Sequence, residues 1–194
     1  PTLVPVLTTG RALEKSKGPL NGTCRRSAWP DTYGSGCRVL NEHHHHIYGL
    51  RPSPNIIAAA LTQQTSNGKI VVLANLLALH GNPLRVAEEY AMLDNMSNGR
   101  IIAGLAPGGG QETFNYNTPA AIQREQFWEA VDLIEQAWTR EGPFAFEGKH
   151  YPLRYVNPWP QPQQQPHPQI WIPGSQSKET MRQCARRGHC YFLS

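Results

Sequence analysis

Four consecutive histidines, His43 to His46, follow Glu42 and form the group in this sequence that is best suited to chemistry. Imidazole acts as a general acid or base near neutral pH, or as a metal ligand. Neighbouring residues of an extended segment point to opposite sides, so four in a row cannot converge on one metal ion. We therefore predict no metal site and one functional histidine, with the others as loop residues. The alternative that none of the four is functional stays open.

Two further segments place small residues at the end of an apolar run, where a flat ligand could lie close to the backbone. One run, 72–80, contains Ala74 and Asn75, and taken alone it also fits an ordinary core strand. In the other, Gly108 to Gly110 follow Ala106 and Pro107, and glycine permits close approach of the backbone to a ligand. The pattern is neither a Walker A loop nor the GxGxxG of dinucleotide-binding proteins.

A fourth segment, Gly174-Ser175-Gln176-Ser177-Lys178, leads from an apolar run into a predicted helix. Hydroxyl groups and the free N–H groups at a helix N-terminus bind phosphate, although Ser177 could also serve only as a helix cap. The sequence contains no GxSxG motif with a Ser/His/Asp order, and no pair of carboxylates stands out. A flat cofactor that carries phosphate therefore explains these segments together better than a hydrolytic scheme.

The elements that must position these residues alternate between strands and helices. The predicted strands are mostly continuously apolar, as parallel strands buried on both faces are, and they span 39–42, 70–75, 100–106, 169–173 and 189–193. Helices are predicted to begin where a capping side chain precedes proline, at Ser53-Pro54, Asn82-Pro83 and Thr118-Pro119. Gly99 is predicted to end the second of these helices. This alternation predicts an α/β fold with a parallel sheet, whose active site lies at the carboxyl ends of the strands.

Two other regions depart from this alternation. Residues 1–38 are poorly patterned, rich in Gly, Pro, Ser and Arg, and show neither helical nor strand periodicity. Within the patterned region 39–194, residues 141–168 predict a short hairpin near Phe144 to Tyr151, followed by a proline- and glutamine-rich loop. We expect this loop to be an ordered insertion over one end of the sheet, because it leads directly into a strong strand.

Composition excludes several classes of protein. The net charge of +4 is scattered and lacks the interleaved aromatic residues of a single-strand binder, so no nucleic-acid partner is expected. No apolar run approaches the ~20 residues of a membrane span, and no secretory signal precedes the first strand. The four cysteines form no CxxC pair and are expected to be reduced thiols. These features predict a cytoplasmic protein.

Taken in order, several of these motifs resemble the bacterial luciferase-like flavin monooxygenases. The similar segments are Glu42-His43-His44, residues 82–89 and 93–100, Phe-Glu-Gly-Lys at 146–149, and Pro-His-Pro-Gln-Ile-Trp-Ile at 166–172. The similarity extends from about Leu40 to the end of the chain. It implies a (β/α)8 barrel in which reduced FMN, delivered by a separate flavin reductase, reacts with O2 to oxygenate a small organic substrate.

The resemblance also implies roles for individual residues. His43 corresponds best to the family's active-site histidine, and His44 competes with it because the histidine run here contains one extra residue. Ala74-Asn75 falls where the family has a non-proline cis peptide beneath the isoalloxazine ring. The ring and ribityl chain would be bordered by Ala106, Pro107, Gly108 and Gly109, and the phosphate would be held by Gly174, Ser175 and Ser177.

Two departures from the family argue against luciferase activity itself. Pro107 stands where luciferase has an arginine that helps to bind phosphate, and Ala106 stands where it has a reactive cysteine. Two alternatives to the FMN monooxygenase stay open: a relative that transfers hydride with the deazaflavin F420, and a non-catalytic flavin-binding remnant.

The length of the chain bears on its activity. A (β/α)8 barrel takes ~250 residues or more, whereas this chain has 194 residues and stops after a predicted strand. We therefore predict a partial barrel, residues 39–194, that lacks the last strands and does not turn over substrate by itself. Because an open sheet leaves unpaired edges, we also expect it to self-associate, so a homo-oligomer is possible.

Overall fold

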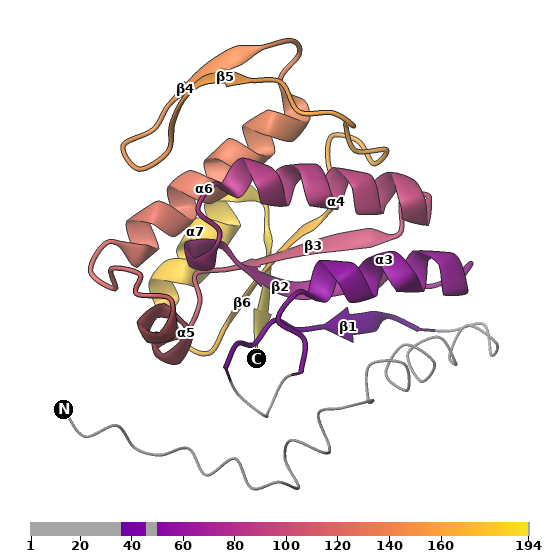
Figure 1. Ribbon diagram of the computed structural model, residues 1–194, viewed down its shortest axis with the longest axis horizontal. Helices are drawn as coiled ribbons and strands as arrows, with labels where there is room; N and C mark the ends of the chain where they lie inside the picture. The colour runs from indigo at the N-terminus through magenta and orange to yellow at the C-terminus, as the bar shows by residue number, and fades with distance from the viewer. Residues whose placement is uncertain (1–35, 46–49, 194) are drawn as a thin grey trace, which may run out of the picture.

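A computed structural model describes residues 36–45 and 50–193, so most of the poorly patterned segment 1–38 lies outside the described residues. Five parallel strands form one sheet in the order β1-β2-β3-β6-β7 (Figure 1). Their bounds are β1 Arg38–Leu40, β2 Ile70–Leu76, β3 Ile101–Ala106, β6 Ile170–Gly174 and β7 Cys190–Leu193. These strands lie within one or two residues of the predicted ones. The predicted parallel α/β fold is therefore confirmed.

Helices connect the strands and cover the sheet. The helices are α3 Pro54–Gln64, the short 3-10 helix η2 Leu77–Leu79, α4 Pro83–Ser97, α5 Gly110–Asn115, α6 Gln123–Thr139 and α7 Lys178–Arg187. Helices α3, α4 and α6 lie side by side on one face of the sheet (Figure 1) and bury a common apolar core against it. The central strand β3 is buried along its whole length, which explains why its sequence is continuously apolar.

Local capping signals located α4 well. The side chain of Asn82 accepts a hydrogen bond from the N–H of Leu84, and Pro83 occupies the first turn. At the other end, Asn98 and Gly99 both adopt the left-handed conformation, with φ of 56° and 75°. Helix α3 also begins at the predicted residue, but the side chain of Ser53 makes no capping hydrogen bond.

The predicted helix start at Thr118-Pro119 is wrong, because α6 begins at Gln123. The Thr118 side chain and N–H both donate to the carbonyl oxygen of Thr113, so they close the preceding helix α5 instead of opening α6. Helix α5 was not predicted, since its six residues carry no apolar periodicity. It lies at the end of the sheet where the parallel strands terminate (Figure 1).

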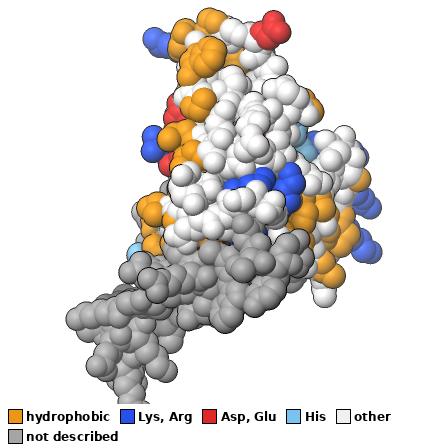
Figure 2. Space-filling model, turned by 90° about the vertical axis from the view of Figure 1, so that its right-hand side faces the viewer, with side chains coloured by type: hydrophobic (Ala, Val, Ile, Leu, Met, Phe, Trp, Pro, Cys, Tyr) orange, Lys and Arg blue, Asp and Glu red, His pale blue; other side chains and the backbone are white. Residues whose placement is uncertain are grey.

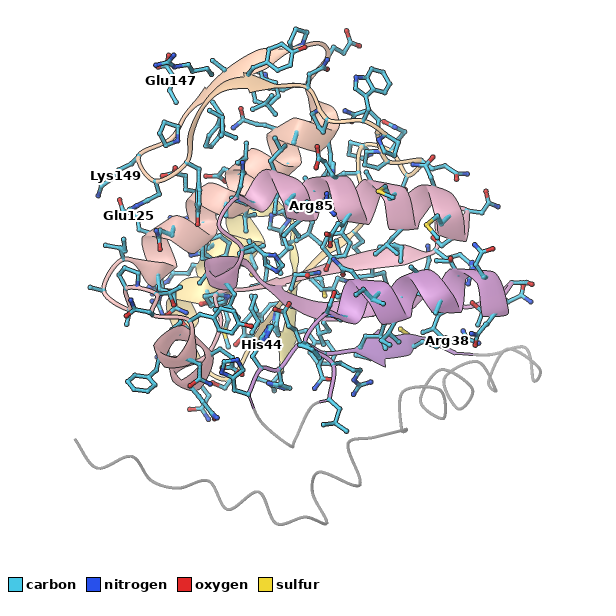
Figure 3. All side chains as sticks on the ribbon, in the orientation of Figure 1. Arg38, His44, Arg85, Glu125, Glu147 and Lys149 are labelled. Carbon is cyan, nitrogen blue, oxygen red and sulfur yellow. The ribbon has the colours of Figure 1, made fainter. Side chains whose placement is uncertain are left out.

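The predicted hairpin is present and longer than expected. Strand β4, Phe144–Glu147, pairs antiparallel with β5, Pro152–Val156, and the hairpin packs beside α6 (Figure 1). The carboxylate of Glu129 on α6 accepts the N–H groups of three consecutive turn residues at 2.7–3.1 Å, and these are Lys149, His150 and Tyr151. Lys149 also pairs with Glu125, and both point into the space between helix and turn (Figure 3).

The loop that follows the hairpin is tied to the amino ends of the strands. Asp94 is fully buried, and its carboxylate accepts both the backbone N–H and the side-chain amide of Gln164, at 2.8 and 2.7 Å. The same amide also donates to the carbonyl oxygen of Ile101 at the start of β3. The insertion is thus ordered over one end of the sheet, as predicted.

Figure 2 shows this amino end of the sheet, with hydrophobic side chains gathered at the top, over the hairpin, and cationic ones across the middle. Arg100, which precedes β3, donates to the carbonyl oxygen of Thr62 in the last turn of α3 and to those of three residues after it, Thr65, Asn67 and Gly68. These bonds consume the free carbonyls at the end of a helix, which is a structural use of charge. In the described part of the chain, no helix has the length and apolar character needed to cross a membrane.

Candidate functional site

The carboxyl group of Glu42 joins the histidine segment to the end of β2. Its side chain is only 2% exposed. One oxygen accepts the backbone N–H of Leu76 at 3.0 Å, and the other lies 2.6 Å from Nε2 of His44. Nε2 of His80, after η2, lies 3.9 Å from Glu42. Because β1 and β2 are neighbours, this buried acid fixes the histidines at the carboxyl end of the sheet.

His44 is held at both ring nitrogens. Besides its contact with Glu42, its Nδ1 lies 2.8 Å from the hydroxyl of Tyr116, which follows α5. The His44 side chain is 8% exposed, and its ring meets that of Tyr116 edge-on (Figure 3 labels His44). A histidine with both nitrogens engaged, one by a buried carboxyl group and one by an exposed tyrosine, is suited to hold the loop in place.

His43 points to a different partner. Its Nδ1 lies 3.1 Å from Oε1 of Glu112 on α5, and its side chain is 33% exposed. Burial is the largest influence on the Glu112 carboxyl and raises its pKa, but hydrogen bonds from His43 and from backbone N–H groups outweigh burial. The pKa of Glu112 therefore lies below its usual range, and this acid is ionised at neutral pH.

The remaining histidines of the run differ from these two. His45 adopts a positive φ of 52°, and its ring stacks on Tyr116 with centroids 5.4 Å apart. His46 lies outside the described residues. Within the described part of the chain, no three His, Cys, Asp or Glu side chains gather in a way that could hold a metal ion.

The end of β2 forms an apolar floor beside the histidines. Ala74 and Leu76 pack with Ala106 of β3 and with Leu79 in a small cluster separate from the main core. Gly104 of β3 lies directly against β2, where an added Cβ would come within 2.1 Å of the carbonyl oxygen of Val72. Ala74 and Ala106 are both buried in this cluster, 4% and 8% exposed.

The predicted cis peptide is present one bond earlier than expected. It joins Leu73 to Ala74, whereas the prediction placed it between Ala74 and Asn75. Asn75 is fixed in the core, because its side-chain amide donates to Asn55 and to the hydroxyl of Tyr90. The irregular part of β2 therefore ends before Asn75, and the pairing with β3 shifts register between Val72 and Asn75. The Asn75 side chain faces the helices and not the floor.

The glycine-rich segment after β3 is shaped by two side chains. The amide of Gln123 donates to the carbonyl oxygens of Pro107 and Gly108, and Gly108 has a φ of 92°, which favours glycine. At Gly109, an added Cβ would lie 2.7 Å from Oε2 of Glu112. The space that glycine leaves at this position is thus occupied by the Glu112 carboxylate.

The predicted phosphate segment lies after β6, at the same end of the sheet. The Ser177 hydroxyl accepts the N–H of Thr180 and caps α7, while Ser175 is exposed. At Gly174, a Cβ would meet the ring of Tyr191 at 2.9 Å. The structure therefore places all described site residues at one end of the sheet, but the Ser177 oxygen already has a partner.

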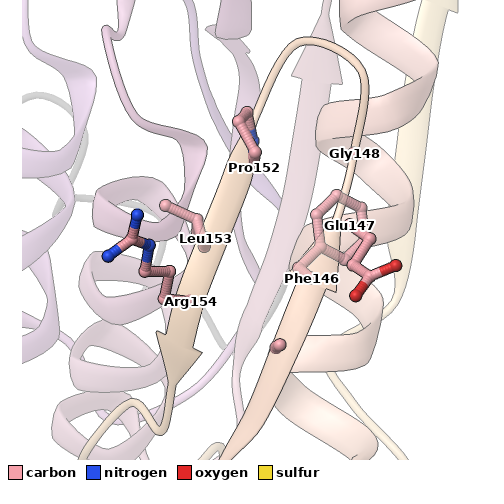
Figure 4. A pocket seen from close by; sticks show the side chains of 7 residues that line it. Phe146, Glu147, Gly148, Pro152, Leu153 and Arg154 are labelled. Atoms are coloured by element: carbon pink, nitrogen blue, oxygen red, sulfur yellow. The ribbon is translucent and has the colours of Figure 1, made fainter.

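Sequence reasoning missed three polar residues of this site: Glu112, Tyr116 and His80. Only Glu112 carried a signal, since it stands three residues after the helix-capping Gly109, where acids are favoured. Two hollows in the structure lie elsewhere. One, of about 510 Å³, is lined by hairpin residues including Phe146, Leu153 and Arg154 (Figure 4), and one of about 310 Å³ lies between α3 and α4.

A sequence model of one protein family, described as luciferase-like monooxygenase, matches residues 38–194. The chain belongs to the luciferase-like monooxygenase family. The family assignment made from the motifs is thus confirmed, and the match covers every site residue named above.

Curated relatives of this luciferase-like chain include three proteins that it matches only in part. Protein y4wF of Sinorhizobium fredii is 34% identical over 81% of this chain and 46% of its own length. 2,5-Diketocamphane 1,2-monooxygenase 2 of Pseudomonas putida is 30% identical over 66% of this chain and 35% of its own length. The oxygenase component of the flavin-dependent trigonelline monooxygenase of Acinetobacter baylyi is 28% identical over 68% of this chain and 36% of its own length. The chain thus spans about half or less of the length of these relatives.

Several solved structures share the fold of this chain. The monooxygenase RslO1 from Streptomyces bottropensis has a TM-score of 0.87 and 27% identity, over 95% of this chain and 56% of that one. The oxygenating constituent of 3,6-diketocamphane monooxygenase from Pseudomonas putida, in complex with FMN, has a TM-score of 0.77 and 23% identity. The match covers 94% of this chain and 52% of that one. An F420-dependent secondary alcohol dehydrogenase has a TM-score of 0.66 and 18% identity, over 83% of this chain and 49% of that one. The luciferase-like chain is therefore a partial (β/α)8 barrel, as predicted.

Proposed function

We propose that this protein is a flavin-dependent monooxygenase that uses reduced FMN and O2 to oxygenate a small organic substrate. The observation that carries the proposal is the Glu42 carboxyl group, which bonds to His44 and to Leu76 and so places the histidines at the edge of the apolar floor. A flat ring beside a histidine is the arrangement that flavin chemistry with proton transfer needs.

The residues present fit a flavin. Ala74 and Ala106 contribute two small apolar side chains, beside Leu76 and Leu79, against which an isoalloxazine ring could lie. The exposed Ser175 at the start of α7, with Lys178 in the first turn, offers a hydroxyl and positive charge to a phosphate. When bound, reduced FMN would supply the two electrons and the activation of O2.

FMN is favoured over F420 by the relatives. Two of them are named as diketocamphane and trigonelline monooxygenases, and one FMN complex shares the fold, whereas the F420 enzyme shares only the fold at 18% identity. The trigonelline enzyme is named as an oxygenase component, which supports a separate flavin reductase as the partner of this protein. The substrate class follows from these names as a small organic molecule.

Anaerobic titration of the purified protein with reduced FMN, reduced riboflavin and reduced F420 tests the cofactor. We expect FMN to bind more tightly than riboflavin, because only FMN carries the phosphate. Ser175→Glu should weaken FMN binding by about tenfold, as one repelled charge contact of ~1.4 kcal/mol would, and leave riboflavin binding unchanged. Ser66→Glu, an exposed serine at the opposite end of the sheet, is the matched control.

The outcomes separate the alternatives. Tighter binding of F420 than of FMN would replace the monooxygenase proposal with hydride transfer. FMN binding without oxygenation of any supplied ketone or heteroaromatic substrate, by a protein that completes the barrel and in the presence of O2 and a flavin reductase, would favour a non-catalytic flavin-binding protein. Equal binding of FMN and riboflavin would remove the phosphate site from α7.

A further inference from the structure

We propose that Glu112 is the positioning residue of the site: it orients His43 and keeps the proton of that imidazole on Nδ1, so that His43 exchanges protons through Nε2. The role of Glu112 rests on the proposed flavin chemistry, but the state of the His43 ring can be tested without it.

The first step is that Glu112 is a fixed anchor. Its side chain is 13% exposed and stands three residues after Gly109, which caps α5. The carboxylate folds back toward Gly109, as an acid at this helix position does. Since Gly109 has no Cβ, its absence leaves room for Oε2, which would lie 2.7 Å from a Cβ there. The acid is thus held by α5 itself and not only by the histidine.

The second step concerns the proton between the two side chains. Oε1 of Glu112 and Nδ1 of His43 are 3.1 Å apart, at hydrogen-bond distance. An ionised carboxylate can only accept a hydrogen bond, so Nδ1 must be the donor. In the neutral ring, Nε2 is then the atom with the lone pair. The lowered pKa of Glu112 agrees with an ionised acid that receives this bond.

The third step is that the same helix holds the neighbouring histidine. Tyr116 follows Glu112 by one helical turn and contacts Nδ1 of His44 at 2.8 Å, while Glu42 holds the other nitrogen of that ring. The backbone on both sides of the His43 ring is therefore restrained. Glu112 sets the rotation of the ring and the position of its proton.

The test reads the ring directly. Two-bond ¹H–¹⁵N NMR spectra of the full chain, labelled with ¹⁵N-histidine, distinguish a proton on Nδ1 from one on Nε2, and His43→Gln assigns the signal. We expect the Nδ1–H form for His43 in the unsubstituted protein. In Glu112→Gln the amide can donate to Nδ1, so the population should shift by at least tenfold toward the Nε2–H form. Glu141→Gln, an exposed acid after α6, should leave the spectrum unchanged.

A kinetic arm connects the ring to the reaction. In a protein that contains this chain within a complete barrel, Glu112→Gln should lower kcat for flavin-dependent oxygenation by about tenfold to a hundredfold, the lower part of the range for acid–base help, while KM changes less than twofold. Thermal unfolding within the range of Glu141→Gln would show that the fold is retained. A His43 ring with its proton on Nε2 in the unsubstituted protein, or an unchanged ring in Glu112→Gln, would overturn the inference. Absence of oxygenation by this chain alone agrees with the partial barrel predicted above, and the NMR result then decides on Glu112.

Discussion

Replacing Glu42 by methionine should destabilise the protein more than replacing it by glutamine, although methionine is the better match to an apolar interior. The Glu42 side chain is 2% exposed, and its oxygens partner the Leu76 N–H at 3.0 Å and the His44 ring at 2.6 Å. Methionine offers neither partner an acceptor, so two buried polar groups lose their bonds. At ~1–3 kcal/mol for each abandoned group, Glu42→Met should cost about 2–6 kcal/mol of unfolding free energy.

Glutamine can keep both contacts. Its oxygen can accept from Leu76, and its amide can donate to Nε2 of His44, which then carries its proton on Nδ1 and donates to Tyr116. We expect Glu42→Gln to cost only about 1 kcal/mol. Urea unfolding followed by circular dichroism measures both, with Glu141→Gln as the exposed control. Equal losses in the two Glu42 variants, or no loss in Glu42→Met, would refute the claim that these hydrogen bonds hold the histidine segment.

Three other predictions follow from packing and charge. Gly104→Ala should lower the free energy of unfolding by more than ~3 kcal/mol, because its Cβ would meet the Val72 carbonyl at 2.1 Å, whereas Gly81→Ala, with nothing within 4 Å, should be neutral in thermal unfolding. The carboxylate of Glu129 accepts hydrogen bonds from three N–H groups of the hairpin turn. Glu129→Ala should therefore speed proteolytic cleavage of this turn more than Glu125→Ala does. His189 has a pKa lowered to about 4 by burial and by the charges of His167 and Arg187. Between pH about 6.5 and about 4, the His189 imidazole is therefore protonated in the unfolded chain and neutral in the folded chain. As the pH falls through this range, the free energy of unfolding decreases by at most ~3 kcal/mol. The carboxyl group of Glu135, 3.5 Å from Nε2 of His189, reduces this loss. The measurement is a series of melting temperatures over this pH range. An equally steep decline in His189→Asn and in the unsubstituted protein would contradict the prediction for His189.

The strands and the main helices could be predicted because their signals are local. Continuous apolar runs gave β2 and β3, and Asn82-Pro83 with Gly99 gave both ends of α4. The hairpin was predicted too short, since the alternation that marks it fades in the exposed half of β5. In each case the physics acts within one turn or one strand, so a single sequence carries it.

The site could be predicted only where its residues lie within such local elements. Glu112 and Tyr116 contact histidines 69 and 72 residues away, and α5 has no periodicity that would reveal a helix. Thr118 was misinterpreted because a hydroxyl before proline can close one helix as well as open the next. The expected position of the cis peptide came from the resemblance to the family and was one bond too late.

The buried acid Glu42 constrains which side of the chain each histidine of the run faces, a point that the resemblance to the family left open. Residues two apart in an extended segment share a side, so Glu42 and His44 can meet, and His43 must then turn to the opposite side. On that side stands Glu112. Because Glu42 is also bound to the Leu76 N–H of β2, the segment cannot slide by one residue without stranding a buried carboxyl group and a buried donor. We therefore propose that the extra histidine of the run is accommodated after His44, where His45 adopts a left-handed conformation, and that His43 takes the catalytic position.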